Sequence, residues 1–226
     1  MTHGNTTNSE PLPLIRKILD WLQISAAVIV VACLFGFIWT RVTHPAEQNT
    51  TTSIANVKLL QVIGANPCWY GEAKASYTLV EFADYQCPPC RATARHVTAL
   101  LNTLHKKVRF TFRNYPLKKL HPYAYPAAVA AEIARKHGCF WQMHDLLYIH
   151  QEELSDAYIE KTLKSFDLHR TAGTLDQKAA AQVIAQDITD GDLCGLKGTP
   201  TFVLCCPDGH ILRLEDINQI SDIVIL

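Results

Sequence analysis

The stretch YTLVEFADYQCPPCRATARHV, Tyr77 to Val97, joins a strand pattern, a close pair of cysteines and a helical pattern. Its first part, Tyr77–Ala83, is short, apolar and partly β-branched, which is typical of a buried strand. Cys87 and Cys90 come next, and from Pro88 onward apolar residues recur at helical spacing. The sequence therefore places the two cysteines at a turn from a strand into a helix.

A cysteine at the start of a helix has a direct chemical use. The N–H groups of the first turn point outward and the helix dipole is positive there, so a thiolate is stabilised and its pKa falls. We interpret Cys87 as a nucleophile that attacks disulfides and Cys90 as the thiol that resolves the mixed disulfide. Two other interpretations are a zinc site, which needs further ligands, and a structural disulfide, which usually ties distant segments.

Pro88 and Pro89 modify this prediction. Proline suits the first helical turn, where its missing N–H would be unpaired anyway. The missing donors are, however, ones that would otherwise face the Cys87 sulfur. We therefore expect a Cys87 pKa nearer to about 7 than to about 3.5, the range known for such cysteines.

Two further features support redox chemistry. Glu81 lies in the strand, six residues before Cys87, where burial would raise its pKa and let it accept the Cys90 proton. The alternative is that Glu81 faces solvent on an open side of the sheet. Thr199-Pro200 opens a later strand in GTPTF, and a proline at such a position is often cis.

The rest of the chain predicts strands and helices in a recognisable order. Val108–Pro116 alternates like a strand, and a helical block follows over about 117–192. TPTFVLCC and HILRL flank Pro207–Gly209, which indicates a hairpin. An edge strand within 56–64 and a last helix within 216–226 complete an α/β fold.

The N-terminal part contains an uncharged stretch of twenty residues, WLQISAAVIVVACLFGFIWT, at 21–40. This length suits a single transmembrane helix, whereas a core helix or a cleaved signal peptide would be shorter or carry charges. Basic residues before it favour a cytoplasmic N-terminus. We predict a cytoplasmic tail at 1–20, an anchor at 21–40, a polar tether at 41–54 and a folded domain at 55–226.

Composition excludes little but is consistent with this organisation. The 226 residues are 48% hydrophobic and carry 21 basic and 21 acidic side chains, so the net charge gives no case for nucleic-acid binding. Eight cysteines suit an oxidising compartment. We expect no metal ion and no cofactor.

Taken together, VEFADYQCPPC, FRNYPLKKLHPYAYPAAVAAE, FWQMHDLL and GLKGTPTF resemble the DsbA-like thiol–disulfide oxidoreductases of the thioredoxin superfamily, over about 65–226. The resemblance implies a thioredoxin-like fold with an inserted helical subdomain and a cis Pro200 packed against the cysteine pair. It implies that Thr199 offers its backbone to an extended substrate near Pro88 and Pro89, and it favours a buried Glu81. The family often has His, Tyr or Phe where this chain has Pro88, which leaves the redox potential open. The resemblance also covers residues that we interpret as packing and capping groups: His121, Pro122, Trp141 and His144.

The leading function is an enzyme that donates disulfides to exported proteins containing cysteines, with its catalytic domain facing the periplasm or cell exterior. Its partner would be a quinone-linked membrane oxidase. One alternative is a reductase or isomerase fed by a transmembrane thiol donor, and another is a thioredoxin-fold module that binds clients without catalysis.

The other exported cysteines are odd in number, so they cannot all pair within one molecule. Cys205 and Cys206, as neighbours on a strand, are expected to point to opposite faces. A disulfide from Cys194 to this strand is one arrangement, and Cys33 is interpreted as an apolar residue of the anchor. The five exported cysteines outside the redox pair are Cys68, Cys139, Cys194, Cys205 and Cys206.

Overall fold

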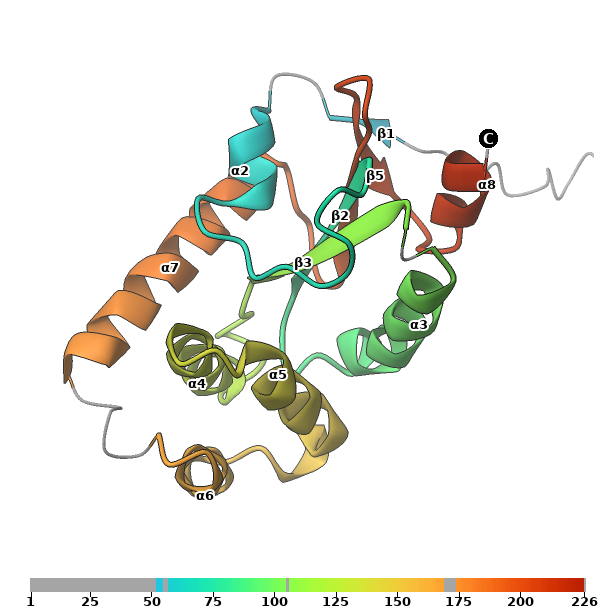
Figure 1. The fold of residues 1–226 in the computed structure, drawn as a ribbon. Coiled ribbons are helices and arrows are strands. Elements are labelled where there is room, and N and C mark those ends of the chain that lie inside the picture. Colours follow the sequence, from blue (N-terminus) through green and yellow to red (C-terminus); the bar gives the residue numbers. More distant parts are fainter. Residues whose placement is uncertain (1–51, 55–56, 105, 169–173, 226) are drawn as a thin grey trace, which may run out of the picture. The chain divides into compact units, whose positions relative to one another are not determined.

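The computed structural model describes residues 52–54, 57–104, 106–168 and 174–225. Its centre is a sheet with the strand order β1-β5-β4-β2-β3 (Figure 1). Strands β2 and β3 are parallel, and all other neighbours are antiparallel. The strands are β1 (Thr52–Ser53), β2 (Tyr77–Ala83), β3 (Val108–Asn114), β4 (Thr201–Cys205) and β5 (Ile211–Leu214). The helices are α2 (Leu59–Ile63), α3 (Pro88–Leu104), α4 (Ala124–Lys136), α5 (Phe140–Ile149), the 3-10 turn η1 (Gln151–Glu153), α6 (Asp156–Ser165), α7 (Thr174–Leu193) and α8 (Gln219–Ile225).

The two faces of the central strand β2 belong to two different apolar cores. Leu79 and Ala83 lie in the larger core, together with residues of α3, α4, α5 and α8. Val80 and Phe82 lie in the smaller core, together with residues of α2 and of the segment after α7. Side chains alternate along a strand, so Glu81 faces the larger core on the α3 side.

The helical block lies between β3 and β4, as predicted for about 117–192. Helix α4 is its centre and packs against α5, α6 and α7. All six alanines of α4 are buried, and such small side chains let neighbouring helices approach closely. In Figure 1, α5 lies on the α3 side of the sheet, whereas α7 runs toward α2.

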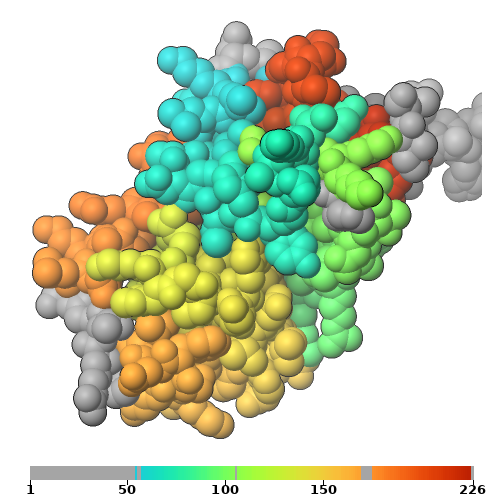
Figure 2. All heavy atoms as spheres, viewed as in Figure 1, coloured from blue at the N-terminus to red at the C-terminus, as the bar shows by residue number. Residues whose placement is uncertain are grey.

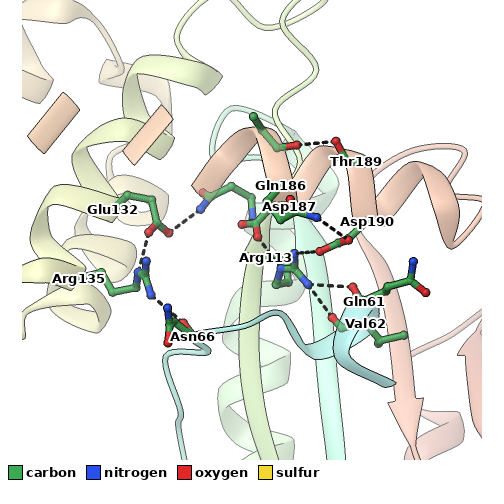
Figure 3. Close-up of polar contacts among 12 residues, drawn as sticks. Gln61, Val62, Asn66, Arg113, Glu132, Arg135, Gln186, Asp187, Thr189 and Asp190 are labelled. Carbon is green, nitrogen blue, oxygen red and sulfur yellow. Dashed lines mark hydrogen bonds and ion pairs between the residues drawn. The ribbon is translucent and has the colours of Figure 1, made fainter. Parts of the chain in front are cut away.

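A buried ion-pair network, centred on Arg113 of β3, joins the helical block to the sheet (Figure 3). The guanidinium Nε lies 2.6 Å from Asp187 Oδ1, and Nη2 lies 2.7 Å from Asp190 Oδ2, both on α7. Nη1 donates to the backbone oxygens of Gln61 and Val62, at 3.0 Å each. One side chain thus connects α2, β3 and α7.

Residues 57–76 cover part of the face shown in Figure 2, above the α4–α5 region. Two hydrogen bonds hold this segment to the helical block. Arg135 Nη1 donates to the Asn66 oxygen at 2.7 Å, and Trp141 Nε1 donates to the Trp69 oxygen at 3.2 Å. The segment before β2 therefore also contributes to the position of the block.

One predicted element near the start of the domain was wrong. The edge strand expected within 56–64 is the helix α2, because Val62 and Ile63 are buried side by side while Leu59 and Leu60 are exposed, a grouping that a strand would not give. The edge strand is instead Thr52–Ser53, which pairs with β5. These two residues fall within the predicted tether.

Other predicted elements are confirmed. Strands β4 and β5 form the hairpin around Pro207–Gly209, and Gly209 takes a positive φ of 89° in its turn. The last helix is α8. The predicted tail and anchor lie outside the described residues. Among the helices that the structure does describe, none is both long and apolar enough to cross a membrane.

Candidate functional site

Cys87 and Cys90 lie where β2 turns into α3, as the sequence predicts. Cys87 immediately precedes the helix, and its backbone oxygen accepts a hydrogen bond from the Arg91 N–H at 3.2 Å. Both cysteines are buried, whereas Pro88 and Pro89 are exposed in the first turn. The prolines thus form the outer surface of the turn above the two sulfurs.

The Cys87 thiol lies in a setting that favours its ionisation. Its pKa falls to about 6, chiefly because the Cys90 thiol donates a hydrogen bond to it, with further lowering from Thr199 and the Cys90 N–H. Burial and the charge of Asp84 act in the opposite direction. The value is nearer to about 7 than to about 3.5. The share of Pro88 and Pro89 in it stays a prediction.

Cys90 behaves in the opposite way. Burial, the hydrogen bond it gives to Cys87 and the nearby charge of Glu81 all raise its pKa well above that of an ordinary thiol. Cys87 therefore ionises first, and Cys90 keeps its proton. This difference between two thiols is what a nucleophile and a resolving group require.

Glu81 is buried on the α3 side of the sheet, with 1% of its surface exposed. Burial is the main cause that raises its pKa to about 8, and the charge of Cys87 adds to it. Its Oε1 atom has no hydrogen-bond partner within the described part of the chain. The alternative in which Glu81 faces solvent was therefore wrong.

The segment before β4 completes the site. The Thr199–Pro200 peptide bond is cis, as the resemblance implies. The Cys87 Sγ donates to the Thr199 oxygen at 3.3 Å, so residues 112 positions apart meet here. An open groove of about 420 Å³ runs along this segment, lined by Lys197, Gly198, Thr199, Pro200, Thr201, Arg213, Leu214 and Glu215.

A zinc site at Cys87 and Cys90 would need further ligands. The described ranges contain no group of three or more His, Cys, Asp or Glu side chains able to hold a metal ion.

Residues 65–224 match a protein-family model described as Thioredoxin. The chain belongs to the thioredoxin family. Its fold is the mixed α/β thioredoxin-like fold, here with α4–α7 inserted between β3 and β4.

Solved structures of this fold are similar to this thioredoxin-family chain. The thiol-disulfide exchange protein alpha-DsbA2 from Wolbachia pipientis is 22% identical with a TM-score of 0.63, covering 74% of this chain and 89% of that chain. A thioredoxin-like oxidoreductase from Silicibacter pomeroyi is 26% identical with a TM-score of 0.61, covering 75% and 96%.

Curated relatives are much longer proteins. The Na(+)/H(+) antiporter NhaA 3 of Salinispora tropica is 43% identical over 136 residues, which are 58% of this chain and 20% of that protein. An antiporter NhaA 1 of Mycolicibacterium gilvum is 30% identical over the same share of this chain and 22% of its own length. The chain thus spans about a fifth of these relatives.

Asp84, which sequence reasoning missed, holds the turn of this thioredoxin-family site. It is buried, and its carboxylate accepts hydrogen bonds from the Gln86 N–H at 2.7 Å and the Leu117 N–H at 2.8 Å. Its Oδ2 also lies 2.8 Å from His121 Nδ1. An Asp that bonds the N–H two residues on is a known turn signal, so its place before Cys87 could have indicated this role.

Gln151 of η1 is a second missed residue. Its Nε2 donates to the backbone oxygens of Tyr85 and Cys87, at 2.9 Å each. The contact joins the helical insertion to the cysteine turn. No local pattern could reveal it, because the partners are 64 and 66 positions away.

Two histidines have the structural settings that were predicted. His144 is buried in an aromatic cluster, packed edge-on against Phe112 and Tyr148, and burial lowers its pKa to about 3. His121 pairs with Asp84. Both side chains therefore help to pack and hold the site.

The five described cysteines outside the pair are all free thiols in this structure. Cys205 lies in the smaller core and Cys206 packs against the larger one, so the two point to opposite faces as predicted. Cys194 belongs to the same smaller core as Cys205. The predicted link from Cys194 to this strand stays a prediction.

Proposed function

We propose that this chain is a thiol–disulfide oxidoreductase whose redox-active groups are Cys87 and Cys90. The observation that carries the proposal is the pair of unlike thiols: Cys87 with a lowered pKa at the start of α3, and Cys90 with a raised pKa beside it. The names of the similar solved structures, a thiol-disulfide exchange protein and a thioredoxin-like oxidoreductase, support it.

Each group then has one role in the oxidation of a client dithiol. A client thiolate attacks the Cys87 sulfur of the Cys87–Cys90 disulfide, that bond breaks, and Cys90 leaves with the electron pair and takes a proton from Glu81. A second client thiolate then attacks the client sulfur of the mixed disulfide, and Cys87 leaves as a thiolate. The client gains a disulfide and the enzyme keeps two electrons as a dithiol.

The groove beside the cis peptide is the proposed client site. An extended client segment would lie along Thr199 and Pro200, with Pro88 and Pro89 as the opposite wall. This position brings a client sulfur to Cys87, because Cys87 already contacts the Thr199 backbone.

We further propose that residues 21–40 anchor the chain in the inner or cytoplasmic membrane as a single span. The catalytic domain would face the periplasm or cell exterior, act on exported proteins and be reoxidised by a quinone-linked membrane partner. The similarity to proteins named as antiporters supports work at a membrane. Antiport itself is not proposed, since the match covers about a fifth of those proteins.

The reverse direction is the second candidate. It is supported by a Cys87 pKa of about 6 and by the exposed Pro88 and Pro89, which have no N–H to donate to the sulfur. A less stabilised thiolate makes the pair a weaker oxidant and a better reductant or isomerase, fed by a transmembrane thiol donor. A binding module without catalysis is the third candidate.

Two measurements separate the three candidates. The reduction potential of the Cys87–Cys90 pair against glutathione, with its redox state in cells, decides the direction: a mostly reduced pair would overturn the oxidase. Turnover of a model disulfide substrate decides catalysis. We expect Cys87→Ser to abolish it, whereas a wild-type chain without turnover would favour the binding module.

A further inference from the structure

A cavity of about 60 Å³ lies beside Glu81, between the sheet, α3 and α5. Glu81 lines it, and the Oε1 atom of this buried carboxyl has no hydrogen-bond partner among the described residues. A buried carboxyl oxygen without a partner is costly, and a space of this size has room for water. The other lining residues are Tyr70, Ala94, Val97, Thr98, Leu101, Phe110, Trp141, His144 and Asp145.

The cavity has a common wall with the outer surface. A groove of about 300 Å³ lies between α3 and α5, lined by Arg91, Arg95, Tyr148 and Ile149. Three residues line both spaces: Ala94, Thr98 and Asp145. Asp145 is the one acid among them, and it is exposed to solvent. A carboxyl group therefore lines both the space next to Glu81 and the groove at the surface.

The proposed chemistry needs such a connection. Glu81 is 1% exposed and Cys90 is fully buried, so neither can exchange a proton with bulk water directly. In each oxidation of a client, Cys90 takes one proton from Glu81 and leaves a buried carboxylate near the new Cys87 thiolate. A proton from solvent neutralises this carboxylate, and it is released again when Cys90 gives up its own proton during reoxidation. In the reverse direction the same proton must leave.

We propose that Asp145 is a proton relay between solvent and Glu81, acting through water in the cavity between them. The inference rests on the proposed function of Cys87 and Cys90 and extends it by one positioning residue and a route. A proton enters at the Asp145 carboxyl from the α3–α5 groove, passes to cavity water, and reaches the unpartnered Oε1 of Glu81. The reverse order releases it.

Other groups near Glu81 are poorly suited to the relay. His144 also lines the cavity, but burial lowers its pKa to about 3 and its Nδ1 lies 3.2 Å from the Tyr85 hydroxyl. Tyr85 and Tyr148 are buried, and their pKa values rise well above the usual range. Cys87 and Cys90 are the reacting thiols. Burial raises the pKa of Asp145 and so brings it closer to the raised pKa of Glu81.

The alternative is that the cavity beside Glu81 is only a packing defect and carries no proton. It predicts that removing the acid at 145 changes stability at most, because nothing passes through the wall. It also predicts that removing Asp145 has the same effect on the rate of proton exchange as removing another exposed carboxyl, such as Asp222 on α8. The test therefore compares Asp145→Asn with Asp222→Asn in the full chain, and adds Asp145→Glu as the conservative variant.

Two readouts are measured on each variant. The first is the rate at which the protonated Glu81 carboxyl exchanges with deuterium, followed by its infrared C=O stretch and identified with Glu81→Gln. The second is the rate at which dithiothreitol reduces the Cys87–Cys90 disulfide, measured by acid quench and alkylation. Neither readout needs a client protein.

We expect Asp145→Asn to slow both rates about tenfold. A positioned acid typically raises a rate about 10²–10⁴-fold. The expected loss is smaller because water in the groove can still deliver protons without the acid. Asp145→Glu and added acetate should restore them, while Asp222→Asn and the reduction potential stay unchanged. An Asp145→Asn chain that exchanges as fast as wild type, or a slow one that acetate does not restore, would overturn the relay. A wild-type chain that fails to oxidise protein dithiols would overturn the proposed function alone, since deuterium exchange at Glu81 still tests the route.

Discussion

The Cys87 sulfur lies 3.3 Å from the backbone oxygen of Thr199, across a gap of 112 residues in sequence. The contact joins the residue just before α3 to the cis peptide before β4. The Thr199 hydroxyl acts on the same sulfur. That hydroxyl is buried without a hydrogen-bond partner among the described residues while Cys87 is a thiol, and it lowers the pKa of Cys87 as the thiolate forms.

Thr199→Val should therefore raise the Cys87 pKa. Valine keeps the shape and the backbone oxygen but removes the O–H donor, so the thiolate loses one hydrogen bond. We expect a rise of about one pKa unit, equivalent to about 1.4 kcal/mol. The check is a titration of thiolate ultraviolet absorbance in the reduced chain. Thr189→Val, an exposed threonine on α7, is the control and should leave the titration in place.

Glu81→Gln should stabilise the oxidised chain at neutral pH. The folded-state pKa of Glu81 is raised from 4.5 to about 8, mainly by burial. Between these values the unfolded chain releases this proton and the folded chain retains it, so wild-type stability falls as pH rises through this window. Below pH 4.5 the carboxyl is neutral in both states and has no such effect.

The expected gap between Glu81→Gln and wild type grows by about 2–3 kcal/mol from pH 5 to pH 7, at about 1.4 kcal/mol per pH unit. Urea unfolding of both chains at several pH values measures it. The oxidised form is used because Cys87 then cannot titrate. A gap that stays constant with pH would show that Glu81 ionises normally in the folded chain.

The parts of the site that could be predicted are local in sequence. Glu81, Cys87 and Cys90 lie within ten residues, and one strand and one helix turn fix their arrangement. The cis peptide at Pro200 was predictable from a short motif together with a resemblance. The residues that hold the cysteine turn from outside could not be predicted in this way. Gln151, for example, reaches the turn from a distant 3-10 helix through side-chain hydrogen bonds alone.

The fold shows the same division. Long helices such as α3 carry enough turns for their periodicity to predict them, and the β4–β5 hairpin has a clear turn signal. Helix α2 has only five residues, so its four apolar side chains fit a strand as well as a helix. Its backbone is also held by Arg113, whose guanidinium donates to the Gln61 and Val62 oxygens from β3, and no local pattern signals this contact.

Gln151→Ala should loosen the cysteine turn. It removes the donor for the Tyr85 and Cys87 backbone oxygens and leaves both buried acceptors without that partner. We expect a loss of about 1–3 kcal/mol in the free energy of unfolding and a slower reaction of Cys87 with a disulfide probe. Gln142→Ala, an exposed position on α5, is the control. Equal effects of the two variants would contradict a specific role for Gln151.

Asp187→Ala should destabilise the domain without changing the Cys87 pKa. Asp187 Oδ1 binds Arg113 Nε at 2.6 Å and its Oδ2 accepts from the Asn114 N–H at 2.9 Å, all in a buried setting. Removing it leaves Arg113 with Asp190 as its one remaining acidic partner in this network, and it leaves the Asn114 N–H without this acceptor. Breaking such a buried pair costs about 3–5 kcal/mol.

Chemical unfolding of the full chain measures this loss, and Asp192→Ala is the matched control. Asp192 is exposed and accepts one hydrogen bond from the Tyr115 hydroxyl at 2.6 Å, so its removal should cost less than about 1.5 kcal/mol. The network lies on the α2 and α7 side of the sheet, whereas Glu81 and the cysteines lie on the α3 side. Stability and thiol chemistry should therefore separate, and a shifted Cys87 pKa in Asp187→Ala would contradict that separation.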